Sequence, residues 1–378
     1  MTGTTITFTG GPIFDGETLL NGQAVRFVDG MLDSILPEAQ LSSGEAVEDL
    51  SGDILSPGYV DLQVNGGGGV MFNDDPSVET LQCIAGAHRG LGATSILPTL
   101  ITDTPEKTTA AIAAAMQAIQ RGVPGIVGLH LEGPYLSERR KGAHDAALIR
   151  PMEDADLAQL LDAAKALPAL MVTLAPESVT IAQVETLANA GVMVSLGHSD
   201  AAYETCVAYA QAGAHCATHL FNAMSQLGNR EPGLVGAVLS NGAMSAGLIA
   251  DAIHVHPQTM RSAFASKQGP GCLFLVSDAM AVAGTELKDF SLEGRIIQRE
   301  NGRLTLQDGT LAGADLDLTT ALRVLTKNVG VSLPDALAAA TRIPAELISQ
   351  NPISRLNMIS QAIRISPDLS RACPVVSI

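Results

Sequence analysis

The sequence predicts an α/β protein, namely a (β/α)8 barrel of the TIM type with a small β-sandwich domain built from both flanks of the barrel. Eight short apolar runs alternate with alanine-rich stretches, which is the pattern of repeated βα units. Apolar residues make up 46% of the chain and charged residues 16%, a balance that favours parallel strands buried on both faces. Two further segments, residues 1–55 and 286–312, combine short β-like runs with turn-forming pairs.

The first segment, residues 1–55, is expected to form the N-terminal part of the small β-domain. Its expected strands are Thr5–Thr9, Gln23–Val28 and Gly52–Leu55, and its turn pairs are Gly10-Gly11, Asp15-Gly16, Asn21-Gly22 and Asp29-Gly30. Such pairs supply the positive φ angles that tight hairpin turns require. The composition therefore predicts hairpins.

Residues 56–285 are expected to form the barrel, whose dependence on a metal is argued from its strand ends below. The expected strands are Pro57–Asn65, Thr94–Thr99, Ile126–Glu132, Leu170–Ala175, Val192–His198, His215–Leu220, Ala246–Asp251 and Leu273–Asp278. The expected helices are Val78–Gly90, Thr108–Arg121, Asp154–Ala166, Ile181–Ala190, Ala201–Ala212 and Pro257–Lys267. Eight parallel strands are the number that closes such a barrel.

The remaining segments are interpreted from their turns. Residues 286–312 contain three turn pairs with glycine and are expected to lie beside the N-terminal segment as an insertion belonging to the small β-domain. Residues 313–345 are expected to supply the last barrel helices, including Asp315–Val329. The tail, residues 346–378, is atypical because no glycine follows Gly330, although a closing β-segment ordinarily needs turn residues with positive φ.

Charge and cysteine content limit the partners and the compartment. A formal net charge of −17 argues against nucleic acid, because binding a polyanion requires a basic surface. Five cysteines without a C-x-x-C pair indicate buried thiols in a reducing compartment. The N-terminus lacks a basic region followed by an apolar run, and no apolar segment reaches membrane-spanning length. We therefore expect a cytoplasmic protein without membrane contact.

Three potential metal ligands stand at equivalent ends of predicted strands. Glu132, His198 and His219 offer one oxygen and two nitrogen donors, and the C-terminal ends of barrel strands meet at one face. Any one of these histidines alone is more often a core or surface residue; three groups at equivalent positions favour a site. A His2Glu set suits Zn²⁺, or Fe²⁺, Co²⁺ or Mn²⁺, with one position left for water.

Two amides and an aspartate complete this predicted face. Gln63 and Asn65 stand where two histidines would supply a second metal, and neutral amides are poor ligands, so we expect one divalent ion with at most weak contacts from this pair. Asp278 ends the eighth strand. It is either a helix N-cap or the general base and acid, which takes a proton from metal-bound water as the nucleophile and returns it to the leaving amine.

Further groups on loops suit an anion and a sugar. Asn222 and Ala223 follow His219 and offer backbone N–H groups, and His254 follows the seventh strand. Arg230 is charged and lies on a loop, where most arginines are simply solvated. His144 follows a short basic run.

With these residues in view, the chain resembles the N-acetylglucosamine-6-phosphate deacetylase family of the amidohydrolase superfamily. The motifs that carry the resemblance are Pro57–Gly66, His130-Leu131-Glu132-Gly133-Pro134, Lys141-Gly142-Ala143-His144, Gly197-His198-Ser199, Thr218-His219-Leu220-Phe221-Asn222-Ala223-Met224, Arg230-Glu231-Pro232-Gly233, Ile249-Ala250-Asp251 with His254, Ser277-Asp278-Ala279 and Leu311-Ala312-Gly313. The resemblance implies hydrolysis of N-acetylglucosamine 6-phosphate to glucosamine 6-phosphate and acetate. The family's usual closing sequence is missing from the tail, which puts the closure of the small domain in question.

The resemblance also implies a role for each site residue. Glu132, His198 and His219 would bind the metal, Asp278 would be the acid and base, and His144 would polarise the acetamide carbonyl. The implied substrate contacts are Asn222, Ala223, His254, His144 and Leu311, with Arg230 reaching across from the partner subunit of a homodimer.

Two other functions remain open at this point. One is another amidohydrolase, such as a cyclic-amide hydrolase or a deaminase, although the His-x-His pair and the bridging lysine of two-metal members are absent. The other is an inactive metal-containing protein that binds a sugar phosphate.

Overall fold

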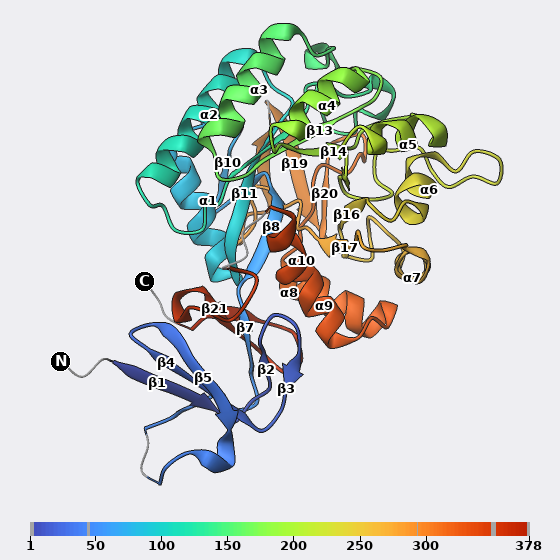
Figure 1. Cartoon of the computed structure of the whole chain (residues 1–378). Helices are drawn as coiled ribbons and strands as arrows, with labels where there is room; N and C mark the ends of the chain where they lie inside the picture. The colour runs from blue at the N-terminus through green and yellow to red at the C-terminus, as the bar shows by residue number, and fades with distance from the viewer. Residues whose placement is uncertain (1–3, 44–45, 293, 349–352, 376–378) are drawn as a thin grey trace.

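A computed structural model describes residues 4–43, 46–292, 294–348 and 353–375. Its centre is an eight-stranded parallel sheet in the order β17-β16-β15-β14-β13-β12-β11-β8 (Figure 1). The sheet closes into a barrel because the chain after β17 pairs with β8, where the N–H of Asn65 donates to the Ala279 carbonyl at 2.9 Å. The predicted (β/α)8 barrel is confirmed.

The barrel elements follow the predicted order. The strands are β8 (Tyr59–Val64), β11 (Ala93–Ile101), β12 (Leu129–Glu132), β13 (Leu170–Leu174), β14 (Met193–Leu196), β15 (Cys216–Ala217), β16 (Ser245–Leu248) and β17 (Leu273–Leu275). The helices are α1 (Val78–Gly90), α2 (Pro105–Gln120), α3 (Asp154–Ala166), α4 (Ile181–Asn189), α5 (Tyr203–Gln211), α6 (Gly233–Ser240), α7 (Pro257–Ser266), α8 (Leu318–Val324), α9 (Leu333–Ala340) and α10 (Arg342–Leu347). A two-stranded hairpin, β9 (Gly66–Gly67) and β10 (Val70–Met71), follows β8.

Local sequence explains where these elements begin. Ser77, Thr104 and Thr180 accept a hydrogen bond from the backbone N–H three residues later, so each caps the first turn of its helix. Nearly every side chain of the barrel strands is buried, because helices cover the outside and side chains fill the inside. Among the described residues, no helix combines the length and apolarity that crossing a membrane requires.

The small domain is a sandwich of two sheets below the barrel in Figure 1. One sheet has the order β5-β4-β1-β6 and the other the order β22-β21-β7-β2-β3. Their strands are β1 (Thr5–Thr9), β2 (Ile13–Phe14), β3 (Leu19–Leu20), β4 (Gln23–Val28), β5 (Met31–Pro37), β6 (Glu48–Asp49), β7 (Ile54–Pro57), β21 (Ala362–Ile365) and β22 (Ala372–Pro374). Phe8, Phe27, Leu55 and Ala362 share one core between the sheets, so segments from both flanks of the barrel build this domain.

The atypical tail closes the small domain despite its lack of glycine. β21 pairs with β7 and β22 pairs with β21, both antiparallel. The turn between them needs one positive φ angle, and Leu369 adopts it at 57°. The Asp368 carboxylate accepts hydrogen bonds from the Ser366 hydroxyl and from both the backbone and side chain of Ser370, which stabilise this turn.

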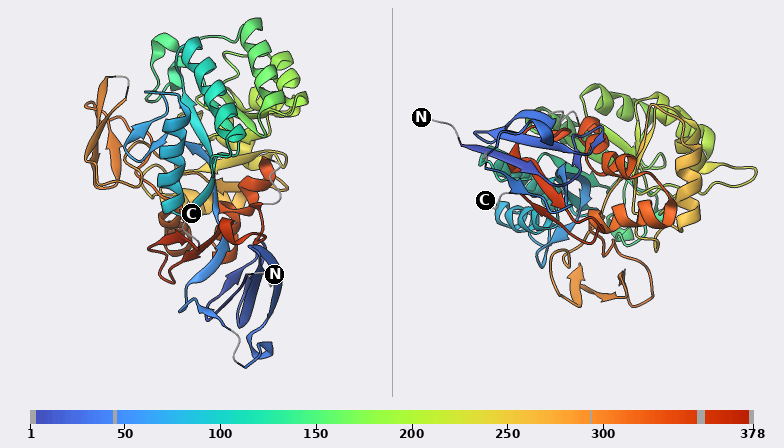
Figure 2. Two further views of the ribbon diagram at one scale, coloured as in Figure 1. Left: turned by 90° about the vertical axis from the view of Figure 1, so that its left-hand side faces the viewer. Right: turned by 90° about the horizontal axis from the view of Figure 1, so that it is seen from below.

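The expected position of residues 286–312 is wrong. Their strands β18 (Asp289–Leu292), β19 (Arg295–Glu300) and β20 (Arg303–Thr305) form a separate antiparallel sheet. Figure 2 shows this sheet beside the barrel, away from β1 to β5. Leu292, Ile297 and Leu304 pack against Ile101 and Met280 of the barrel, so the apolar face of the hairpin is buried there instead of in the sandwich. We refer to residues 286–312 as the flanking lobe.

Candidate metal centre and active site

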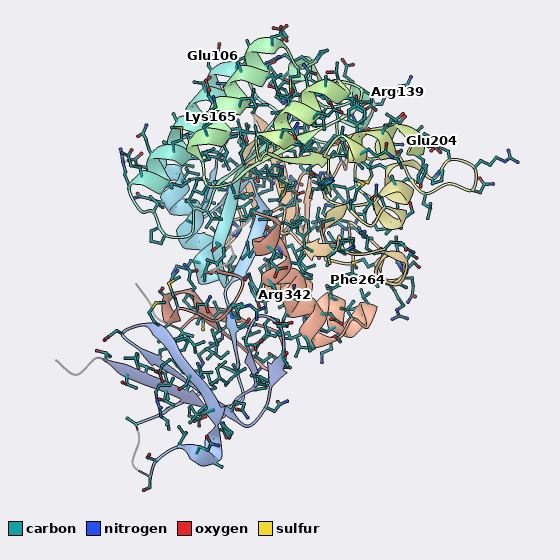
Figure 3. All side chains as sticks on the ribbon, in the orientation of Figure 1. Glu106, Arg139, Lys165, Glu204, Phe264 and Arg342 are labelled. Carbon is teal, nitrogen blue, oxygen red and sulfur yellow. The ribbon has the colours of Figure 1, made fainter. Side chains whose placement is uncertain are left out.

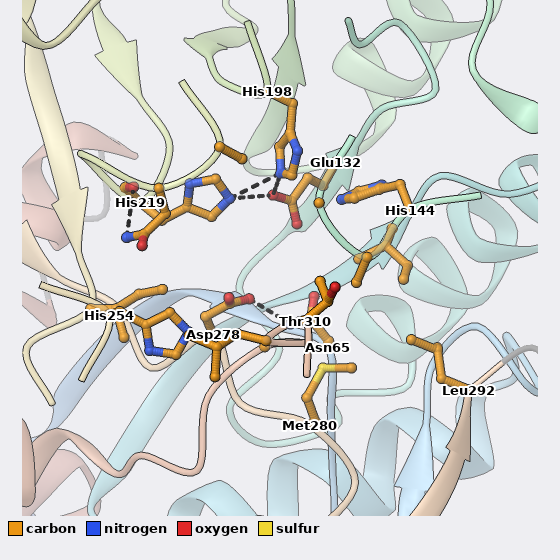
Figure 4. Close-up of a pocket in the computed structure, with 18 residues that line it drawn as sticks. Asn65, Glu132, His144, His198, His219, His254, Asp278, Met280, Leu292 and Thr310 are labelled. Atoms are coloured by element: carbon orange, nitrogen blue, oxygen red, sulfur yellow. Dashed lines mark hydrogen bonds and ion pairs between the residues drawn. The ribbon is translucent and has the colours of Figure 1, made fainter. Parts of the chain in front are cut away.

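The three predicted metal ligands meet at the mouth of the barrel. Glu132 ends β12, and His198 and His219 each lie two residues beyond their strands, β14 and β15. The Nε2 atoms of the two histidines are 3.0 Å apart, and each lies 3.1 Å from Oε1 of Glu132 (Figure 4). All three side chains are buried, with 2–5% of their surface exposed. Their separation in the chain makes this convergence a product of the fold.

The chemistry of this donor set fits a divalent cation. The Nδ1 N–H of His198 donates to the Arg140 carbonyl at 2.8 Å, which leaves a lone pair on Nε2 of a neutral ring. That lone pair faces the Nε2 of His219 and a carboxylate oxygen, and neither Lys nor Arg is among the described residues that line the cavity. Burial opposes ionisation of Glu132, but the two neighbouring imidazoles outweigh it in the metal-free site and hold the pKa of Glu132 well below its usual range. A cation satisfies all three donors at once.

The backbone turns sharply at three of the site residues. His198, His219 and Asp278 have positive φ angles of 47°, 32° and 51°. For residues with a Cβ atom this conformation costs on the order of 1–2 kcal/mol each. The strain brings each side chain over the mouth of the barrel directly after its strand, and it is held by the surrounding packing.

Asp278 is held by the amide of Gln63 in β8 and by the amide of Asn65 directly after that strand. Nδ2 of Asn65 donates to its Oδ1 at 2.7 Å, and Nε2 of Gln63 donates to the same oxygen at 3.2 Å. Gln63 Nε2 also lies 3.2 Å from both oxygens of Glu132, so these amides serve the carboxylates. Burial and the nearby charge of Glu132 raise the pKa of Asp278 to about 6.

His144 is fixed as a neutral hydrogen-bond donor. The backbone N–H of Thr102 donates to its Nδ1 at 3.3 Å, and the Thr102 hydroxyl lies 2.8 Å from the same atom. Nδ1 therefore accepts, and the proton is on Nε2. Burial, followed by the neighbouring His198, lowers the pKa of His144 to about 3, so the ring stays uncharged at neutral pH. The ring centroids of His144 and His198 are 4.4 Å apart.

A cavity of about 270 Å³ joins these groups. Of the residues predicted from the sequence, it is lined by Glu132, His198, His219, Asp278, Asn65, His144, Asn222, Ala223, His254 and Leu311. Gln63 is not among the residues that line the cavity, but its amide contacts the carboxylates of Glu132 and Asp278. Arg230 does not line the cavity; it is exposed on the loop that precedes α6 and extends outward in Figure 1.

The two sides of this cavity differ in polarity. Nδ1 of His254 donates to Asp251 at 2.6 Å, and the amide of Asn222, which also lines the cavity, donates to the His219 carbonyl at 3.2 Å. Leu292 and Met280 lie across the view from His254 in Figure 4, and Ile101, which also lines the cavity, belongs to the same apolar cluster. Neither these apolar lining residues nor Thr102 could be predicted from the sequence, because apolar residues and a lone threonine carry no motif that distinguishes them from core residues.

Comparisons of this chain with known proteins agree on one family. The model of the amidohydrolase family matches residues 54–357. The chain is 43% identical over 302 residues to the N-acetylgalactosamine-6-phosphate deacetylase of Shewanella sp. (strain ANA-3), covering 80% of this chain and 76% of that protein. It is 35% identical to the N-acetylglucosamine-6-phosphate deacetylase of Haemophilus influenzae, covering 88% of this chain and 85% of the relative.

Solved structures share the whole fold. The N-acetylglucosamine-6-phosphate deacetylase from Pasteurella multocida is 32% identical, with a TM-score of 0.91 and coverage of 98% of this chain and 97% of that chain. A mutant of the N-acetyl-D-glucosamine-6-phosphate deacetylase from Mycobacterium smegmatis, in complex with N-acetyl-D-glucosamine-6-phosphate, is 28% identical, with a TM-score of 0.89 and the same coverage.

Proposed function

The chain belongs to the amidohydrolase family, and from this premise we propose that it hydrolyses the acetamide of N-acetylglucosamine 6-phosphate, releasing glucosamine 6-phosphate and acetate. The observation that carries the proposal is the convergence of Glu132, His198, His219 and Asp278 on one cavity. This is the arrangement that hydrolysis of an unactivated amide needs, because it combines a metal site with a base whose pKa is suited to proton transfer.

Glu132, His198 and His219 would hold one divalent cation, and two nitrogens with one oxygen favour Zn²⁺. When bound, the cation supplies Lewis acidity, which polarises the amide carbonyl and makes water acidic enough to ionise near neutral pH. The Arg140 carbonyl keeps the lone pair of His198 directed at this site.

Asp278 would accept the proton of the attacking water and return it to the leaving amine. Asn65 and Gln63 both donate to Oδ1 of Asp278, so its Oδ2 stays available for the proton. A pKa of about 6 keeps the carboxylate ionised at neutral pH while leaving it basic enough to accept a proton.

His144 would donate its Nε2 hydrogen to the acetamide carbonyl oxygen. Thr102 fixes the tautomer that makes this possible, and the low pKa of His144 prevents the ring from gaining a positive charge that would repel the cation. A donor that is already oriented stabilises the negative charge that develops on this oxygen without reorganisation.

The polar side of the cavity would bind the sugar phosphate. Asn222, Ala223 and His254 line this side, and Leu311 lies on the cavity wall. Arg230 is too exposed to act within its own subunit's cavity, so we propose a homodimer in which Arg230 reaches the phosphate bound by the partner.

A second candidate substrate is the 4-epimer, N-acetylgalactosamine 6-phosphate. The 43% identity to a deacetylase named for that sugar favours it. Both sugars present the same acetamide and phosphate, so the proposed chemistry is shared. Comparing kcat/KM for the two epimers on one preparation decides between them.

The test is acetate release by the zinc-loaded protein with each sugar phosphate. Asp278→Asn should reduce kcat by at least about a hundredfold, because it removes a general base, while the zinc content stays at that of the unsubstituted protein. Full activity of this variant would remove Asp278 from the mechanism. Tight binding of zinc and sugar phosphate without turnover in the unsubstituted protein would instead favour an inactive binding protein.

A further inference from the structure

The loop of residues 137–141 holds His198 from two directions. The Arg140 carbonyl accepts the N–H of His198 Nδ1 at 2.8 Å, and the N–H of Ser137 donates to the His198 carbonyl at 2.9 Å. His198 needs such support, because its backbone adopts a positive φ of 47°. The orientation of its ring therefore depends on where the Arg140 carbonyl lies.

An ion pair fixes that carbonyl. Nε and Nη2 of Arg140 lie 2.8 Å and 2.7 Å from Oδ1 of Asp200, which is two residues beyond His198. The turn that carries Asp200 is itself anchored to Glu177, whose carboxylate accepts the Asp200 N–H at 2.7 Å and the Ser199 hydroxyl at 2.9 Å. The Arg140 side chain thus ties the loop after β12 to the segment after β14 that carries His198.

We propose that the Arg140–Asp200 ion pair is a positioning device that sets the affinity of the metal centre by holding the Arg140 carbonyl against His198. The inference rests on the metal ligands of the proposed function. Partners that orient a ligating histidine typically change metal affinity by 10- to 100-fold. A partly exposed ion pair, by contrast, adds little to global stability. The side chains of Arg140 and Asp200 are 36% and 32% exposed, so the ion pair should add little to global stability. Because it holds the carbonyl that orients His198, it should nevertheless change the metal affinity.

Arg139 provides a matched control from the same loop. Its guanidinium lies 3.9 Å from Oδ2 of Asp200 and is 84% exposed, and Figure 3 shows the residue at the outer edge of the molecule. Arg139→Ala removes one positive charge near Asp200, as Arg140→Ala does, but it leaves the hydrogen bonds between Arg140 and Asp200 in place. If Asp200 acted on the metal only through its charge, substituting Arg139 or Arg140 would change the Zn²⁺ dissociation constant by similar amounts.

The experiment measures the Zn²⁺ dissociation constant of the full chain by competition with a chromogenic chelator. Arg140→Ala and Asp200→Ala should each weaken zinc binding about tenfold, and the double variant should lose no more than either single one, because both substitutions break one interaction. Arg139→Ala should change the constant less than twofold. Asp200→Asn, which preserves shape, provides the same comparison if an alanine variant does not fold, as judged by circular dichroism of the metal-free protein.

Two results would overturn the inference: zinc binding by the Arg140 and Asp200 variants equal to that of the unsubstituted protein, or losses that add in the double variant. Absence of zinc binding by the unsubstituted protein would overturn the proposed metal centre as well. Since the readout is metal affinity, a failure of the deacetylase assay alone leaves the inference standing.

Discussion

Asp61 is a buried acid directly beneath the active site. It has no exposed surface, and its carboxylate accepts hydrogen bonds from the backbone N–H groups of Gln63 and Ser277 at 3.2 Å. Burial raises the pKa of Asp61 to about 7. Because the folded state binds this proton more tightly than the unfolded chain, the stability contributed by Asp61 is complete below about pH 4 and is lost as the pH rises through 7.

We therefore expect the stability difference between the Asp61→Asn variant and the unsubstituted protein to depend on pH. The melting temperature of the variant, relative to the unsubstituted protein, should rise between pH 4 and pH 7 and level off above that, because an amide does not titrate. The change corresponds to on the order of 4 kcal/mol at most. Thermal unfolding in excess chelator measures it without a contribution from metal binding. Asp162→Asn, at a side chain that is 77% exposed, controls for the loss of one charge.

At the residue scale, site residues that stand at the ends of strands could be predicted from the sequence. Site residues whose contacts depend on how two loops meet could not. Glu132, His198, His219 and Asp278 could be found because each stands at the end of an apolar run, and parallel strands present these ends on one face. Thr102 could not be found, because its contact with His144 joins residues 42 positions apart on two loops. No local pattern indicates which loops meet.

The flanking lobe supplies one wall of the active site. Leu292 at the end of β18 has no exposed surface and lines the cavity, and it lies across the view from His254 in Figure 4. An apolar wall suits the methyl group of the acetamide, and a polar one suits the sugar. The lobe is therefore in a position to limit the length of the acyl chain.

Leu292→Ala should relax this limit. Removing the side chain enlarges the acyl end of the cavity, so the ratio of kcat/KM for the N-propionyl substrate to that for the N-acetyl substrate should rise about tenfold, as one methylene in a pocket is worth on that order. Steady-state kinetics on both sugar phosphates measure the ratio. Leu304→Ala removes an equally buried leucine from the same lobe, away from the cavity, and should leave the ratio unchanged. Equal shifts in the two variants would contradict the role of Leu292.

At the scale of elements, helices defined by local chemistry could be predicted from the sequence, whereas elements defined by packing could not. The bounds of α1 and α3 match their prediction because capping residues and apolar spacing define them. α6 was missed because its sequence is apolar on all sides and gives no helical period. The position of the flanking lobe was wrong because hairpin composition does not specify which apolar surface a hairpin covers. In the tail, Leu369 adopts the positive φ that the analysis reserved for glycine.

At the scale of the whole molecule, the proposed dimer makes activity depend on two subunits. Arg230 lies on an exposed loop outside the cavity of its own chain, near Leu227, whose side chain is 59% exposed. If Arg230 acts across the interface, a mixed dimer can carry the substitution of Arg230 on one subunit and the substitution of a site residue on the other. Closed twofold symmetry then gives each dimer two equivalent composite sites.

Co-expression of the Arg230→Ala and Asp278→Asn variants should reveal this arrangement. Arg230→Ala should reduce kcat/KM for the phosphorylated sugar at least about tenfold but leave the unphosphorylated sugar unchanged, because it removes a charged contact to phosphate. A mixed dimer with Asp278→Asn contains one site with both residues intact, so random pairing should restore about a quarter of full activity. Light scattering verifies the dimer, and each variant expressed alone is the control. No recovery on co-expression would place Arg230 outside the partner's site.

The strand order of the small domain has a consequence for synthesis on the ribosome. Arg364 of β21 pairs with Asp53 across 311 positions of sequence, and β21 lies between β7 and β22 in the sheet. Translation delivers β2, β3 and β7 early, yet β21, which pairs with β7, emerges only after every barrel strand has been made. Domains usually fold in the order in which they are translated. Here the sheet that contains β7 can complete its pairing only after the barrel strands have been made, although three of its strands are among the first parts of the chain to be translated.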